Sequence, residues 1–198
     1  MAGSPDLWTR WGEWQNKNAH GMKGGEALIQ ELNRIVHSSG IASPVTTTRG
    51  LAARLRYLDS DAGRAELAEQ GVTPRALRSW MEGNVTPSPK SRERIDAAYW
   101  VRRRANLVRS GWLARHLDNN GQGRRMEIYP VNQSGVDEKY RRALSDRSIT
   151  VRYIWSDLVD AWADRNEDLV DEIWDDVISD LDSDYNAYAY VSAIGIGA

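Results

Sequence analysis

A short segment in the first half of the chain carries arginines at a spacing suited to reading a nucleic-acid base. Thr73-Pro74 is typical of a helix N-cap followed by the first helical residue. The helix is predicted to end at Gly83-Asn84. Arg75, Arg78 and Ser79 lie on one side of this helix. Arginine can form two hydrogen bonds with a guanine edge, and a helix N-terminus favours a nearby phosphate.

The opposite side of the same helix is apolar. Leu77, Trp80 and Met81 form a stripe that points nearly away from the arginines. Val72 precedes the helix and is also predicted to be buried. We therefore expect the apolar stripe to pack against a core and to leave the arginines facing outward.

The segment before these residues completes a helix-turn-helix pattern. Residues 61–70 have helical spacing, and Gly71 permits the left-handed backbone of a tight turn. The pattern predicts a helix-turn-helix between about Arg49 and Arg104. A double-stranded DNA partner is the expectation that follows.

More basic residues follow on the next predicted helix, which begins at Ser88-Pro89. Lysine and arginine there could neutralise backbone phosphates, which provides affinity without sequence preference. The residues predicted to contact DNA are Thr73, Arg75, Arg78, Ser79, Lys90, Arg92, Arg94, Arg102, Arg103 and Arg104.

The net charge of −2 conceals a strong charge separation along the 198 residues. Residues 74–125 hold twelve Arg or Lys against four Asp or Glu, whereas residues 151–185 hold twelve acidic side chains against two basic ones. The acidic stretch has two interpretations: it is the solvated face of amphipathic helices, or it binds a basic protein partner or the chain's own basic middle.

Hydrophobic periodicity predicts a mainly α protein with a small β element: a helix-turn-helix domain followed by an acidic, helical α+β region. Strand-like alternation occurs at 125–129 and 149–153, and Ser134 is predicted to cap a short helix over 136–144. Helical spacing occurs at 28–36, 51–58, 61–70, 74–82, 89–104, 107–117, 155–162 and 169–181.

Three regions are predicted from these patterns. Residues 1–44 form an N-terminal arm and helix, 45–120 the helix-turn-helix domain, and 121–198 the acidic region, which could serve dimerisation or partner binding. The apolar stripe from Leu169 to Leu181 either covers its own core or forms a homodimer interface. Residues 185–198 are a terminal strand or a frayed tail, and Trp8, Trp11 and Trp14 belong to a docking helix or a loose arm.

Composition argues against several classes of protein. The chain has no cysteine and three scattered histidines, which excludes disulfides and disfavours a metal site. It has neither a glycine-rich phosphate loop nor a nucleophile elbow, so neither a cofactor nor enzyme activity is expected. No apolar run approaches the ~20 residues of a membrane span. The expected location is cytoplasmic and nucleoid-associated.

The exit from the arginine-bearing helix resembles that of phage-repressor-like helix-turn-helix domains. The shared pattern is Trp80-x-x-Gly83-x-x-x-Pro87-Ser88. Such domains place a small residue four positions before the turn glycine and an apolar one immediately before it. Here those positions hold Leu67 and Gln70, so the second helix is expected to pack in a shifted register.

The order of parts from about Arg49 to Asp180 is similar to that of the terminal, telomere-binding proteins of linear actinobacterial chromosomes and plasmids. This resemblance implies regulation, replication or end maintenance of a mobile or linear replicon, with at most a covalent link between a hydroxyl and the DNA 5′ end. The alternative is a non-enzymatic virion or plasmid-maintenance subunit whose acidic tail binds a partner. The pattern singles out no hydroxyl among Thr86, Ser88, Ser110, Ser134, Tyr140, Ser145, Ser148 and Thr150.

Overall fold

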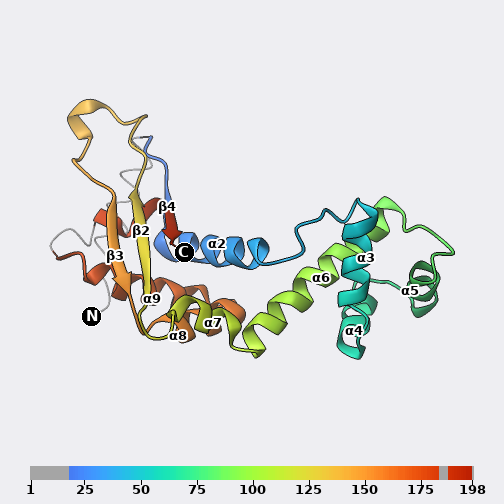
Figure 1. The fold of residues 1–198 in the computed structure, drawn as a ribbon. Helices are drawn as coiled ribbons and strands as arrows, with labels where there is room; N and C mark the ends of the chain where they lie inside the picture. Colours follow the sequence, from blue (N-terminus) through green and yellow to red (C-terminus); the bar gives the residue numbers. More distant parts are fainter. Residues whose placement is uncertain (1–17, 183–186, 198) are drawn as a thin grey trace. The chain divides into compact units, whose positions relative to one another are not determined.

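The computed structural model describes residues 18–182 and 187–197, and the prediction of a mainly α protein with a small β element is confirmed (Figure 1). Trp8, Trp11 and Trp14 lie outside the described residues. The helices are α2 (Gly24–Ser38), α3 (Thr48–Tyr57), α4 (Asp61–Glu69), α5 (Pro74–Met81), α6 (Pro89–Arg109), α7 (Trp112–Asp118), α8 (Trp155–Ala163) and α9 (Glu167–Ser179). The strands are β1 (Met22–Lys23), β2 (Arg124–Pro130), β3 (Arg147–Val151) and β4 (Tyr190–Ile196). They form an antiparallel sheet in the order β1-β4-β2-β3.

The described chain divides into two compact units. One comprises residues 35–111, which we call the helical unit, and the other the described residues before 35 and after 111, which we call the sheet unit. The divisions fall at 34/35 and 111/112, whereas the sequence predicted 44/45 and 120/121. The N-terminal division differs because β1 pairs with β4, which joins the first described residues to the C-terminal part.

Serine and threonine set the beginning of each helix from α3 to α6 in the helical unit. The side chains of Thr47, Ser60, Thr73 and Ser88 each accept a hydrogen bond from a backbone N–H in the first turn of α3, α4, α5 and α6. Such caps satisfy N–H groups that have no partner inside the helix. These helices pack around a hydrophobic core, and Tyr99 is the largest fully buried side chain in it.

An ion pair between a buried arginine and a half-buried aspartate joins α3 to α6. Arg54 is 4% exposed, and its Nε donates to Asp96 Oδ1 over 2.5 Å. The same guanidinium donates to the carbonyls of Ser43 and Gly50. A buried arginine is tolerated only when its donors are satisfied in this way, so Arg54 positions α3 against α6 and the preceding linker.

The sheet unit packs helices against one face of the sheet. Met126 and Ile128 of β2 are fully buried. Trp174 of α9 donates from its indole Nε1 to the carbonyl of Tyr188 over 3.0 Å. Its ring lies so close to Gly24 that a Cβ there would meet the indole Nε1 at 1.9 Å. Trp162 of α8 donates in turn to a side-chain oxygen of α2.

The apolar stripe of α9 is largely buried inside this unit. Val170, Ile173, Trp174, Val177 and Ile178 are all buried. The apolar stripe is therefore covered within the chain itself, so its burial needs no second copy. A homodimer through the C-terminal helices stays a prediction. The terminal segment, for which two interpretations were open, forms β4 over residues 190–196.

Two predicted helices differ from the structure. The helix expected over residues 136–144 with Ser134 as its cap is wrong, because a single turn of 3-10 helix is found, at Glu138–Tyr140. The Gln133 amide bonds both the N–H and the carbonyl of Arg142, and such side-chain bonds compete with a helix. The helix expected over 107–117 is broken at Gly111, which has a φ of +64°.

Among the described residues, no helix combines the length and the apolar character needed to cross a membrane.

Candidate nucleic-acid interface

The predicted helix-turn-helix is formed by α4, a tight turn and α5. Gly71 in the turn has a φ of +74°. Residues that carry a Cβ rarely adopt this backbone conformation. The N–H of Val72 donates to the carbonyl of Leu67 over 2.9 Å and closes the end of α4. Thr73 then caps α5, since its Oγ1 accepts the N–H of Ala76 over 3.2 Å. Helix α5 therefore begins where the sequence predicted.

The two sides of α5 differ largely as predicted. Leu77 is buried in the core of the helical unit, and Trp80 packs partly against that core. Arg75 and Arg78 are exposed, and Ser79 is half-buried. The separation of an apolar inner side from an arginine-bearing outer side is thus present in the fold.

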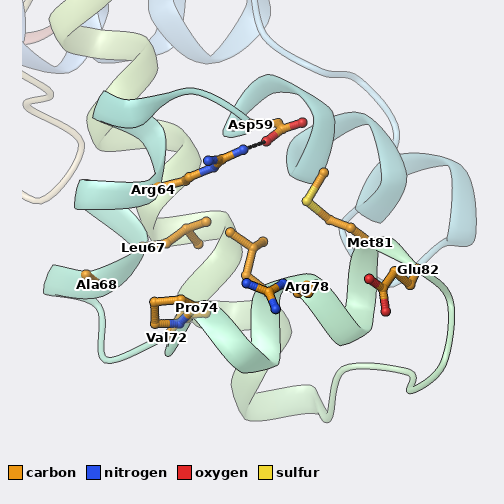
Figure 2. A pocket seen from close by; sticks show the side chains of 10 residues that line it. Asp59, Arg64, Leu67, Ala68, Val72, Pro74, Arg78, Met81 and Glu82 are labelled. Carbon is orange, nitrogen blue, oxygen red and sulfur yellow. Dashed lines mark hydrogen bonds and ion pairs between the residues drawn. The ribbon is translucent and has the colours of Figure 1, made fainter.

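The burial predicted for Met81 is wrong. Its side chain is 43% exposed. It lines a hollow between α4 and α5 instead of the core, as Figure 2 shows. Leu77 also lines this hollow but is buried, whereas Met81 is exposed, so the buried side of α5 consists of Leu77 and, in part, Trp80.

The positive charge around α5 is not balanced locally. The helical unit contains thirteen Arg or Lys against seven Asp or Glu, a net charge of +6. Within residues 18–182 and 187–197, neither Arg75 nor Arg78 has an ion pair or a hydrogen-bonded side-chain partner. Their guanidinium groups are available to an anionic or hydrogen-bond-accepting ligand.

The basic residues at the start of α6 have two different environments. Lys90 is exposed beside the capped N-terminus of the helix. Arg92 donates to the carbonyls of Thr46 and Pro87. Arg94 donates to the carbonyl of Gly71 over 3.4 Å. These hydrogen bonds hold the linker and the turn, and because the acceptors are neutral they do not themselves neutralise the charge of Arg92 and Arg94.

The three consecutive arginines of α6 lie away from this region. Lys90 and Arg103 are thirteen residues apart on one helix, which corresponds to roughly 20 Å at 1.5 Å per residue. Arg103 donates to the backbone carbonyl and to the hydroxyl of Ser39, so it anchors the linker after α2. Arg102 and Arg104 are half-buried. The structure therefore separates residues 102–104 from Lys90 and the start of α6.

Two further arginines were not among the predicted site residues. Arg49 and Arg56 are exposed on α3 and are seven residues apart, which places them on one side of that helix. Their spacing is visible in the sequence, but it carries no signal that separates a phosphate contact from an ordinary solvated face.

A hollow of about 340 Å³ separates the two helices of the motif (Figure 2). Leu67 occupies the position that repressor-like domains give to a small residue. It is buried in the core and also forms part of the wall of the hollow. Gln70 is half-exposed.

The hydroxyls that stayed open as priming groups have ordinary structural neighbours. Ser88 caps α6 and Ser148 accepts a hydrogen bond from Arg125. The ring of Tyr140 lies 4.8 Å from the ammonium of Lys139. Activation of a hydroxyl needs an adjacent base, and the hydrogen bonds of Ser88 and Ser148 come from a backbone N–H and a guanidinium, neither of which is a base.

The outer side of α9 is strongly acidic. Glu172, Asp175 and Asp176 are exposed on this helix. Partial burial, followed by repulsion from the neighbouring carboxylates, raises the pKa of the Asp175 carboxyl above its ordinary value. These carboxylates thus crowd one another on the surface of the sheet unit.

Comparisons with known protein families, with curated proteins and with solved structures found no match for this chain. Its function is therefore inferred from the chemistry of its own residues.

Proposed function

We propose that this protein binds double-stranded DNA by placing α5 in the major groove. The observation that carries the proposal is the exposure of Arg75 and Arg78, without partners in the described structure, on a helix anchored from behind by Leu77 and Trp80. A major groove accepts one α-helix, and arginine on its outer side can bond the guanine edge.

The other basic residues have a different role in this proposal. Lys90 lies at the N-terminus of α6 and contacts backbone phosphate, aided by the helix dipole. Arg92 and Arg94 position the linker and the turn and add positive potential. Thr73 caps α5 and Ser79 shares its outer side. Residues 102–104 could meet only a more distant phosphate.

A mobility-shift titration of random-sequence and genomic duplexes tests this proposal. Arg75→Gln and Arg78→Gln should each weaken binding of the preferred duplex by about 1–3 kcal/mol, roughly 5- to 150-fold. Arg109→Gln removes the same charge from an exposed position near the end of α6 and should change affinity little. Equal effects of all three substitutions would show that α5 does not read the DNA.

We further propose that the DNA belongs to a mobile or linear replicon, where the protein acts in regulation, replication or end maintenance. The arrangement of parts that suggested this role supports it only at the level of layout. Incubation with labelled nucleotide separates end maintenance from regulation, because an end-maintenance protein forms a covalent protein–nucleotide adduct and a regulator does not.

A second candidate function is an assembly subunit that binds a basic protein through α9. It is favoured by the crowded carboxylates of Asp171, Glu172, Asp175 and Asp176. A stoichiometric protein partner that is lost with Asp175→Asn and Asp176→Asn, in the absence of nucleic acid, would support this candidate.

A further inference from the structure

The hollow between α4 and α5 has the size and lining of a small-molecule site. Its volume of about 340 Å³ lies within the usual range for such sites. Its walls are mostly apolar, and Figure 2 shows Leu67 and Ala68 of α4 across from Pro74 and Met81 of α5. An apolar surface of this kind is stabilised when a ligand excludes water from it.

One of the four charged side chains around the hollow has no partner within the described part of the chain. Asp59 and Arg64 form an ion pair of 2.7 Å. Glu82 accepts a hydrogen bond from the amide of Asn84 over 2.9 Å. Arg78 has neither an ion pair nor a hydrogen-bonded side-chain partner among the described residues. The rim therefore carries two carboxylates and two guanidiniums, and Arg78 is the guanidinium whose donors are left for a ligand next to the apolar walls.

We propose that this hollow binds a small anion with an aromatic or aliphatic body. The body lies between α4 and α5, and the anionic group pairs with Arg78. The consequence rests on the proposed function: a ligand that holds Arg78 withdraws it from a guanine edge, so ligand and DNA compete.

Two residues make the hollow suitable for this role. Leu67 stands where related motifs have a small residue that lets the two helices approach, and here its side chain forms a wall of the hollow. Met81 is exposed although it is apolar. An unbranched thioether adapts to ligands of different shape, so Met81 can cover the body of a bound ligand.

Fluorescence titration with 8-anilinonaphthalene-1-sulfonate tests the site, because this dye combines an apolar body with one anionic group. Arg78→Gln should weaken dye binding about tenfold, the loss expected for a charge-assisted pair. Arg75→Gln is the control on the same helix, since Arg75 does not line the hollow, and should leave dye affinity unchanged. The uncharged analogue N-phenyl-1-naphthylamine should bind the unaltered protein and the Arg78→Gln variant equally. Equal dye affinity for Arg78→Gln and Arg75→Gln would overturn the role of Arg78.

Filling the hollow provides a second, independent test. Ala68 is exposed and lines the hollow, whereas Ala65 is exposed on the same helix but does not line it. Ala68→Trp should reduce dye affinity more than tenfold, and Ala65→Trp should not reduce it. Both variants should unfold at the temperature of the unaltered protein. Dye affinity that is unchanged by Ala68→Trp would place the dye elsewhere and overturn the site.

Competition with DNA tests the consequence. The dye should weaken duplex binding by the unaltered protein and should have no effect on the Ala68→Trp protein. Simultaneous, independent binding of dye and duplex would overturn the competition. Because dye binding is measured without DNA, its failure leaves the proposed function standing. If the unaltered protein fails to bind duplex, the proposed function fails while the dye result still decides the site.

Discussion

At the scale of single residues, arginines of the same helical unit have opposite roles. Arg75 and Arg78 have exposed guanidinium groups with no partner in the described structure, whereas Arg54 is buried and donates to one carboxylate and two carbonyls. Arg103 is bonded to Ser39. Sequence spacing separated the outer side of α5 from its inner side. It offered no means to recognise Arg54, because the partner carboxylate lies 42 positions away.

The ion pair of the buried Arg54 with the half-buried Asp96 predicts a large stability loss when Arg54 is removed. Arg54→Ala leaves Asp96 without its partner and two carbonyls without a donor, so the free energy of unfolding should fall by about 3 kcal/mol. Urea unfolding measures this change. Arg56→Ala removes an exposed arginine from the same helix and should cost less than about 0.5 kcal/mol. Similar losses in the two variants would contradict a structural role for Arg54.

The crowded carboxylates of α9 predict a pH-dependent effect. Because the pKa of Asp175 is raised in the folded protein, the folded state binds more protons than the unfolded state just above the ordinary carboxyl pKa. Stability contributed by this group therefore falls as pH rises through that range. Asp175→Asn should raise the unfolding temperature at pH 7, and the gain should shrink as pH falls toward 4.

Thermal unfolding at the two pH values and in high salt checks this prediction. Asp157→Asn, an exposed carboxylate in the first turn of α8, is the control and should not stabilise at pH 7. A gain for Asp175→Asn that grew toward pH 4 would have the wrong sign.

At the scale of elements, the helix boundaries of the helical unit were the most predictable feature. Thr73-Pro74 and Ser88-Pro89 supply a side-chain cap and a preset backbone angle, and both helices begin there. Such caps can be predicted because the residues that form them are adjacent in the sequence. The pairing of β1 with β4 could not be predicted, because it joins Met22 to Val191 and a strand of two residues has no detectable periodicity.

The cap of α5 predicts a measurable contribution to stability. Thr73→Ala removes the acceptor of the Ala76 N–H and should cost about 1 kcal/mol of unfolding free energy. Thr73→Ser keeps a hydroxyl oxygen in the same position and should retain most of this contribution to the unfolding free energy. Chemical unfolding of the two variants makes the comparison, and equal losses would mean that the hydroxyl is not the capping group.

The loop after β2 shows why the rest could not be predicted. The apolar positions between 136 and 144 have helical spacing, but the amide of Gln133 bonds the backbone of Arg142 across the loop. The hollow beside α5 is similar: Leu67 departs from the repressor-like pattern, and only the packed structure shows that its side chain forms a wall.

At the scale of the whole molecule, charge is divided between the two units. The helical unit carries a net charge of +6 within a chain whose total is −2, which assigns −8 to the rest of the sequence. The proposed DNA contact lies on the positive unit, and the acidic side of α9 lies on the unit that belongs to the negative remainder.

The positive unit predicts a steep salt dependence of DNA binding. Each phosphate contact releases counterions, so the logarithm of affinity should fall linearly with the logarithm of salt concentration. Lys90→Gln should lower that slope by about one and weaken all duplexes to a similar extent. Lys139→Gln, an exposed lysine of the sheet unit, should leave the slope unchanged. Titrations at several salt concentrations check the comparison. An unchanged slope for Lys90→Gln would show that Lys90 does not contact DNA phosphate.

The most direct test of the central claim replaces a single nitrogen of the DNA by carbon. After the preferred duplex is selected from a random pool, each guanine in turn is replaced by 7-deazaguanine, which lacks the N7 acceptor in the major groove. We predict that one replacement weakens the unaltered protein about tenfold and has no further effect on the Arg78→Gln protein. If every replacement weakens both proteins equally, or weakens neither, Arg78 does not read a guanine and α5 is not the recognition helix.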